Sequence, residues 1–247
     1  VPTDWGLFDL PDPKTQGLMT LEGIDMILKL WSAEAPFDFK GDFWRIRIAD
    51  PVPELGIGEL LKPYQRPHPP IAMSIVKGES MAARTAGQRG YIPISTNPVP
   101  FATVARQWEV YCEGAEEGGQ PPPDRASWRV SRSIYVGESN EEARQHCLNG
   151  SFGRSFEYLI RVLTSLDMLP LMKRDPEMPD EAVTPEYCMD ELAIVGDVDE
   201  CTRQLNELYE VSGGFGTLLM IAQDWDDKEK WHQSIERLAK DVVPQLP

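Results

Sequence analysis

The sequence predicts an α/β protein built on a parallel β-sheet. From about residue 70 onward, short apolar runs alternate with segments of helical length, which is the pattern of right-handed β–α–β units. One run, "FGTLLMIA", is apolar without interruption, as strands covered on both faces of a parallel sheet are. At 247 residues, with 41% hydrophobic and 26% charged residues, the chain has the length of one large α/β domain or two ordinary domains.

The first 70 residues are less regular. Prolines and glycines make residues 1–25 turn-rich, and they lead into "TLEGIDMILKLWS", whose apolar residues share one helical stripe. The next segment, "FDFKGDFWRI", alternates around Lys40-Gly41 and predicts a β-hairpin or another extended excursion. Residues 49–70 are rich in proline and polar residues, so we expect a loop there.

The regular part begins at Pro70. Four strands are expected, at Ile71–Val76, Tyr91–Ser95, Trp128–Gly137 and in "FGTLLMIA". Helices are expected over Ser80–Arg89, ended by Gly90, and from Pro98 to about Glu117. Asn140 is expected to cap the short helix "EEARQHCL", and Asp197-x-x-Glu200 resembles a capping box for the helix that Gly213-Gly214 ends. Trp231, Ile235, Leu238 and Val242 mark a final amphipathic helix.

Residues 149–192 interrupt this rhythm after the third strand. They hold an aromatic helix, "SFEYLIRVL", and then a passage rich in proline and acidic residues. Because this interruption of about 40 residues exceeds an ordinary connection, we expect a functional lid or insertion. Four strands fit either a small open sheet or half of a (β/α)₈ barrel, and the pattern alone leaves both alternatives open.

Charge and cysteine usage restrict the function. A formal net charge of −16 argues against a nucleic-acid partner, which needs clustered Lys and Arg. No apolar run approaches the length that spans a bilayer, and Val1-Pro2-Thr3-Asp4 lacks the pattern of a signal peptide, so we expect no membrane association. The four cysteines form no CxxC pair, which favours reduced thiols in the cytoplasm over a disulfide scaffold or a zinc site. No metal is expected, because the three histidines lack ligand spacing.

Several segments, in this order and at these spacings, resemble the bacterial luciferase-like flavin-dependent monooxygenases. The similarity is to the C-terminal part of that family and covers nearly the whole chain. Its carriers are "VPTDWGLFDLPDPKTQ" leading into "EGIDMILKLW", then "PPIAMSIVKGESMAARTAGQRGY", "AIVGDVDECTRQL" and "GGFGTLLMIAQDW". In detail they bring to mind the limonene-monooxygenase-like branch.

The resemblance implies a (β/α)₈ TIM barrel of the bacterial luciferase type that binds flavin at the carboxyl ends of its strands. Residues 1–247 are then the C-terminal part of one barrel domain, with about strands 5–8 and an insertion at 149–192 after strand 7. The implied activity is that of a two-component monooxygenase, in which a separate flavin reductase supplies reduced FMN. With O₂, this FMN oxygenates a small hydrophobic substrate. A homodimer is the expected assembly. Two alternatives stay open: an F420-dependent oxidoreductase of the same fold, and a non-catalytic fragment or binding subunit.

Candidate site residues follow the same resemblance. Glu79-Ser80 matches the Glu-Ser pair that contacts the flavin phosphate in the family, at a helix N-terminus whose free amides favour anions. Glu79 cannot accept a hydrogen bond from a phosphate dianion, so it is expected to hold the loop through backbone amides or to bind a neighbouring cation that reaches the phosphate. Without the resemblance, Ser80 is an ordinary N-cap and Glu79 a first-turn carboxylate.

The remaining candidates are weaker. The small side chain of Ala83 would let a phosphate approach, and one of Met73 and Ser74 should face the barrel interior near the flavin. Asn97, at the end of the second strand, is a candidate for the pocket mouth. Three aromatic side chains of the insertion helix are candidates for a hydrophobic substrate cavity or, equally, for packing: Phe152, Phe156 and Tyr158. No catalytic residue is assigned, because the catalytic histidine common in the family would lie upstream of Val1.

Overall fold

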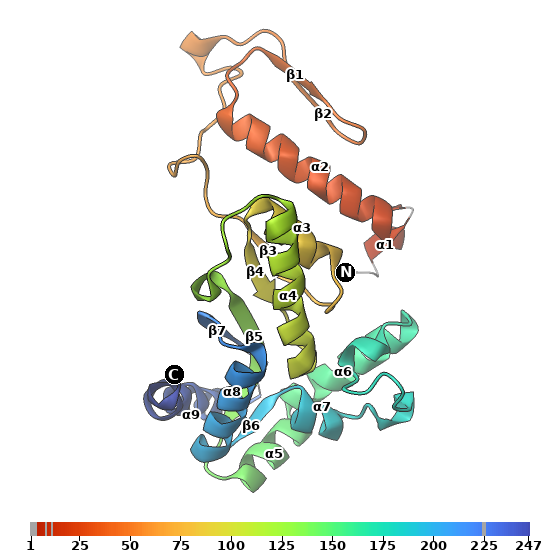
Figure 1. Ribbon diagram of the computed structural model, residues 1–247, viewed down its shortest axis with the longest axis vertical. Coiled ribbons are helices and arrows are strands. Elements are labelled where there is room, and N and C mark those ends of the chain that lie inside the picture. The colour runs from red at the N-terminus through yellow and green to blue at the C-terminus, as the bar shows by residue number, and fades with distance from the viewer. Residues whose placement is uncertain (1–3, 8, 11, 224–225) are drawn as a thin grey trace. The chain divides into compact units, whose positions relative to one another are not determined.

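The computed structural model describes residues 4–7, 9–10, 12–223 and 226–247 (Figure 1). The chain folds into two compact units, Val1–Pro70 and Ile71–Pro247. The boundary falls at the residue where the regular strand–helix pattern of the sequence begins.

The N-terminal unit consists of helices and a hairpin. Its elements are α1 (Asp4–Leu7), α2 (Pro13–Ser32), β1 (Phe37–Lys40), β2 (Arg45–Ile48) and a 3₁₀ turn at Pro53–Leu55. Helix α2 starts earlier than the turn-rich composition of residues 1–25 predicts, because Asp12 caps it by accepting a hydrogen bond from the Thr15 amide. Pro13 occupies the first helical position, where its missing N–H costs nothing.

The predicted β-hairpin is confirmed. Strands β1 and β2 pair antiparallel, with Phe37 opposite Ile48 and Lys40 opposite Arg45. The carboxylate of Glu22 in α2 accepts hydrogen bonds from the amides of the hairpin loop, at 2.7 Å from Trp44 and 2.9 Å from Asp42. These backbone bonds lower the pKa of Glu22 despite the opposing effect of desolvation.

The second unit contains a parallel five-stranded sheet. Its strands are β3 (Ala72–Ile75), β4 (Ile92–Ser95), β5 (Arg129–Val136), β6 (Ile194–Gly196) and β7 (Thr217–Ile221). The order is β3-β4-β5-β6, and β7 also pairs with β5. The prediction of four strands was wrong by one: β6 has three residues, too few to establish a strand pattern in the sequence. It pairs with the last three residues of β5, while β7 pairs with the first five.

Helices follow the strands in this unit. They are α3 (Met81–Arg89), α4 (Phe101–Glu117), α5 (Asn140–Asn149), α6 (Ser151–Ser165), α7 (Pro185–Glu191), α8 (Val198–Ser212) and α9 (Lys228–Arg237). Gly90 and Gly213 end α3 and α8 in the left-handed conformation, as expected of glycine after a helix. A π-helical turn at Leu238–Val242 extends α9.

The caps of α5 and α8 differ in part from the prediction. Ser139, not Asn140, caps α5 by accepting from the Glu142 amide at 3.2 Å. Asn140 instead accepts from the backbone amide of Asp197 at 2.8 Å and so connects the starts of the two helices. Asp197 caps α8 through the Glu200 amide, so only this half of the predicted capping box forms.

Helices α3 and α4 pack in backbone contact (Figure 1). A Cβ on Gly87 would lie 2.1 Å from the Tyr111 carbonyl oxygen, and one on Gly114 would lie 2.1 Å from that of Arg84. Glycine is therefore required at both crossing points, because neither backbone atom can move aside independently. This packing fixes the N-terminus of α3 against α4.

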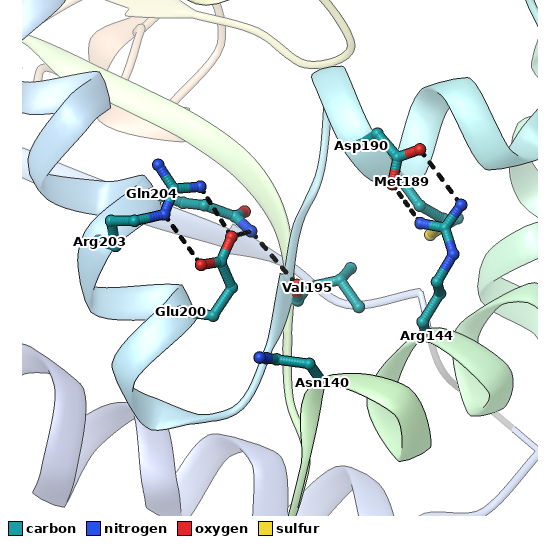
Figure 2. A pocket seen from close by; sticks show the side chains of 8 residues that line it. All are labelled: Asn140, Arg144, Met189, Asp190, Val195, Glu200, Arg203 and Gln204. Atoms are coloured by element: carbon teal, nitrogen blue, oxygen red, sulfur yellow. Dashed lines mark hydrogen bonds and ion pairs between the residues drawn. The ribbon is translucent and has the colours of Figure 1, made fainter.

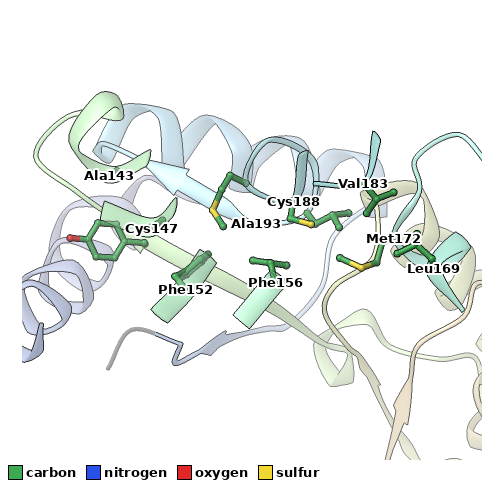
Figure 3. Packing of buried hydrophobic residues seen from close by; sticks show 12 residues of the cluster. Ala143, Cys147, Phe152, Phe156, Leu169, Met172, Val183, Cys188 and Ala193 are labelled. Carbon is green, nitrogen blue, oxygen red and sulfur yellow. The ribbon is translucent and has the colours of Figure 1, made fainter. Parts of the chain in front are cut away.

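Residues 149–192 form part of the hydrophobic core. Their buried side chains join Tyr135 of β5 and Ala143 and Cys147 of α5 in one cluster (Figure 3). The members contributed by α6, the following 3₁₀ turns and α7 are Phe152, Phe156, Leu169, Met172, Val183, Cys188 and Met189. Burial on this scale ties the segment firmly to β5 and α5.

Candidate functional site

The N-terminus of α3 has the features expected of an anion cradle. Ser80 caps the helix in an extended conformation, and its Oγ accepts from the Ala82 amide at 3.2 Å. The amides of Met81 and Ala83 have no intrahelical acceptor, because they belong to the first turn. The Ser80 hydroxyl proton stays available for a ligand while Oγ accepts. Ala83 is fully buried against Ile75 and Val110, so its side chain faces the core and not a phosphate, contrary to the expectation for it. The chemistry of this donor set fits a phosphate group.

Glu79 binds a cation of the neighbouring helix α4, and that this cation reaches a phosphate stays a prediction. Its Oε1 accepts from Arg106 Nε of α4 at 2.5 Å. The same guanidinium donates through Nη1 to Glu109 at 2.8 Å and to Glu113 at 3.1 Å. These hydrogen bonds, that of Glu79 being the strongest, raise the pKa of Arg106.

Gln107, the neighbour of Arg106 in α4, holds the strand end that enters the loop. It is fully buried, and its Nε2 donates to the Val76 carbonyl at 2.8 Å. From the β4 side, Thr96 donates its hydroxyl to the Ile75 carbonyl at 2.9 Å. The carboxyl end of β3 is thus fixed by side chains from two neighbouring elements.

The strand register separates the two faces of the sheet. Ile75 packs with Ala83 of α3 and Val110 of α4, so it marks the helix-covered face. Met73 shares that face by alternation, whereas Ser74 lies on the opposite face and is exposed. Ser74 pairs in register with Ile94, and Ile94 with Arg129, which extends this second face across β4 and β5.

A polar cluster lies on this second face, where β4 and β5 meet. The Asn97 amide donates to Ser131 Oγ at 3.1 Å, and Asn97 Nδ2 donates to Ser133 Oγ at 2.9 Å. Both serines are buried, and the Oδ1 atom of Asn97 is buried with no partner among the described residues. Gln223, two residues beyond β7, likewise has a buried Oε1 without a described partner, while its Nε2 donates to Ser155. Two acceptors therefore remain at the carboxyl ends of β4 and β7, which both pair with β5.

The three aromatic candidates occupy different environments. Phe152 and Phe156 are fully buried in the core cluster, with ring centroids 5.8 Å apart. Tyr158 is 67% exposed. They do not converge on one cavity in the described structure, and their role toward a substrate stays a prediction.

A surface cavity lies elsewhere, between α5, α7, β6 and α8 (Figure 2). It measures about 290 Å³, and none of the sequence-predicted site residues lines it. Its charged side chains are paired: Arg144 with Asp190, and Arg203 with Glu200 at 2.7 Å. Among the described residues, no group of three His, Cys, Asp or Glu is arranged to hold a metal ion, and no helix has the length and apolarity that a membrane span needs.

Comparison with known proteins identifies the family. The profile of the luciferase-like monooxygenases matches residues 4–214. The chain belongs to the luciferase-like monooxygenase family. It is 31% identical to 3,6-diketocamphane 1,6-monooxygenase of Pseudomonas putida, over 92% of this chain and 61% of that protein. It is 30% identical to limonene 1,2-monooxygenase of Rhodococcus erythropolis, over 61% of this chain and 36% of that protein.

A solved structure gives the same result for the fold. The oxygenating constituent of 3,6-diketocamphane monooxygenase, a type II Baeyer–Villiger monooxygenase in complex with FMN, superposes with a TM-score of 0.80. The sequences are 30% identical, and the alignment covers 94% of this chain and 64% of that one. The predicted α/β fold of the bacterial luciferase type is confirmed. The chain spans about three fifths of the length of these diketocamphane monooxygenase relatives.

Sequence reasoning missed several residues that lie around the candidate site. Polar residues stand at every second position of "RVSRSI", at Arg129, Ser131 and Ser133, and this period of two was the available signal. Arg106 and Gln107 gave no signal, because the loop that they contact lies about 30 residues away in sequence.

Proposed function

We propose that this chain is the C-terminal part of an FMN-dependent, two-component monooxygenase that oxygenates a small hydrophobic organic compound. The observation that carries the proposal is the cradle at Ser80, set at the carboxyl end of a barrel strand in a luciferase-like chain. The similarity to an oxygenating constituent that holds FMN supports the choice of cofactor. The similarity to enzymes named for diketocamphane and limonene supports the substrate class.

Each part of the cradle has a role toward the cofactor. The Ser80 hydroxyl and the Met81 amide would hold the phosphate, and Ser74, on the other face of β3, would contact the ring system. Asn97 and Gln223 offer buried acceptor oxygens to N–H or O–H groups of the cofactor or substrate. Reduced FMN, when bound, supplies the electrons that activate O₂. The chain's own contribution is to bind and orient the reactants and to exclude water.

The supply of reduced FMN by a separate reductase, a homodimeric assembly and a cytoplasmic location complete the proposal. The first of these is supported by the similarity to a protein that is the oxygenating constituent of 3,6-diketocamphane monooxygenase. All three are properties of the natural full-length protein, since this chain spans only part of its relatives' length.

Calorimetric titration of the natural full-length protein tests the proposal. FMN should bind more tightly than riboflavin, and reduced FMN with O₂ should yield oxygenated product from a cyclic ketone or terpene. Hydride exchange with F420 in place of this reaction would favour the F420-dependent alternative. If the protein binds neither FMN nor F420, both enzyme hypotheses are refuted and the non-catalytic binding subunit remains.

A further inference from the structure

The phosphate loop Val76–Ser80 is held at both ends by adjacent residues of α4. At one end Gln107 Nε2 donates to the Val76 carbonyl, and at the other Arg106 Nε donates to the Glu79 carboxylate. Between these contacts, Gly78 lies under the Arg106 side chain, where a Cβ would sit 3.3 Å from Arg106 Cγ. The loop therefore lies against α4 over its whole length.

Burial makes the Gln107 contact specific. The side chain is fully buried, and its Oε1 has no partner among the described residues. Burying an amide group whose oxygen has no hydrogen-bond partner is costly. The hydrogen bond from Nε2 to the Val76 carbonyl is therefore the contact that stabilises the Gln107 side chain in this position. The Arg106 contact lies nearer the surface, with about a third of that side chain exposed.

Charge explains why the Arg106 contact is needed. A carboxylate at the start of a helix interacts favourably with the helix dipole, but it repels a bound phosphate. Pairing with Arg106 turns the Glu79 carboxylate toward α4 and compensates its charge. Glu109 and Glu113 hold the same guanidinium from the other side and fix its position.

We propose that Arg106 and Gln107 are positioning residues for the phosphate cradle, acting on Ser80 and the α3 amides through Glu79 and the Val76 carbonyl. The inference rests on the proposed function, because it takes a flavin phosphate as the ligand. In this proposal, Glu79 orients the loop through its contact with Arg106. Helix α4 thereby contributes to cofactor binding, which the sequence did not indicate.

The test compares Arg106→Met with Arg84→Met in the natural full-length protein. Methionine keeps most of the stem over Gly78 but removes the ion pair with Glu79. Arg84 joins the same two helices through Glu117 and through Glu113, which it shares with Arg106, and its side chain does not contact the loop. Its variant is the control, because Glu79 and Glu109 still hold Arg106 when Arg84 is replaced. Binding of FMN and of riboflavin is measured by calorimetry, and stability by urea unfolding.

Arg106→Met should weaken FMN binding about tenfold, which corresponds to the loss of one charge-assisted hydrogen bond. The affinity for riboflavin should stay within about twofold of that of the wild type. Arg84→Met should lower stability to a similar extent without changing the ratio of the two affinities. Equal losses of FMN and riboflavin affinity in Arg106→Met, or an FMN affinity equal to that of the wild type, would overturn the inference. Wild-type protein that does not distinguish FMN from riboflavin would instead refute the phosphate assignment, and this inference with it.

Two variants of Glu79 separate orientation from charge. Glu79→Gln keeps an oxygen that accepts from Arg106 Nε, so FMN affinity should stay within about threefold of wild type, whereas Glu79→Ala should lose about tenfold. Tighter FMN binding in both variants would show that the carboxylate acts only by repelling the phosphate, which contradicts a positioning role.

Discussion

Substitution of Gly114 by alanine tests the helix packing that supports the cradle. The new Cβ would lie 2.1 Å from the Arg84 carbonyl oxygen and 2.8 Å from the carbonyl carbon. Ordinary C···O contacts are about 3.3 Å, so α3 and α4 must separate by roughly 1 Å at this point. Overpacking of this kind costs about 1–3 kcal/mol, and the obstructing atoms here are backbone, which favours the upper end of that range. The gain in helix propensity returns about 0.5–1 kcal/mol.

We therefore expect Gly114→Ala to lower the free energy of unfolding by about 2 kcal/mol, and Tm by about 4–8 °C. Urea denaturation followed by circular dichroism at 222 nm measures the first quantity. Gly17→Ala in α2 is the control, because no atom lies within 4 Å of its Cβ, and it should stabilise by about 0.5–1 kcal/mol. A Gly114→Ala protein as stable as the wild type would show that the helices are not in backbone contact.

Two further predictions concern buried groups. Arg132 is fully buried and stacks on Phe101, its Nε and Nη2 lack partners in the described structure, and burial lowers its pKa. Arg132→Met should leave stability unchanged or raise it by about 1–3 kcal/mol in urea unfolding, and a loss of more than about 2 kcal/mol would reveal an anionic partner. Burial raises the pKa of Cys188 and Cys201 to about 12, while Cys112 is partly exposed. Raised pKa values suppress the thiolate, so at pH 8 Ellman's reagent should label Cys112 first and the other two only after unfolding; their rapid native labelling would contradict their burial.

Local signals in the sequence predicted the elements that carry the cradle. Ser80 as N-cap and Gly90 as helix end depend on residues within one turn, so their chemistry can be read directly. The short strand β6 was missed because three residues cannot show a period. The start of α2 was missed because prolines and glycines outnumber the helix signals around Asp12.

Tertiary partners were the part that sequence could not supply. Glu79 and Arg106 are 27 residues apart, and Asn97 and Ser133 are 36 apart. The sequence left two partners open for Glu79, the backbone amides of its loop or a cation, and only the packing of α3 on α4 shows that it contacts Arg106. The polar cluster likewise depends on the register of β4 against β5, which no single segment encodes.

The phosphate role of Ser80 is the central claim, and one measurement tests it directly. Ser80→Ala in the natural full-length protein removes both the cap and the hydroxyl donor. The affinities of the variant and wild type for FMN and riboflavin are compared by calorimetry. We predict that the affinity for FMN falls by about tenfold or more, while the affinity for riboflavin changes by less than about threefold. Equal losses for the two flavins would contradict the account, because the loss would then come from a destabilised helix rather than from a missing phosphate contact.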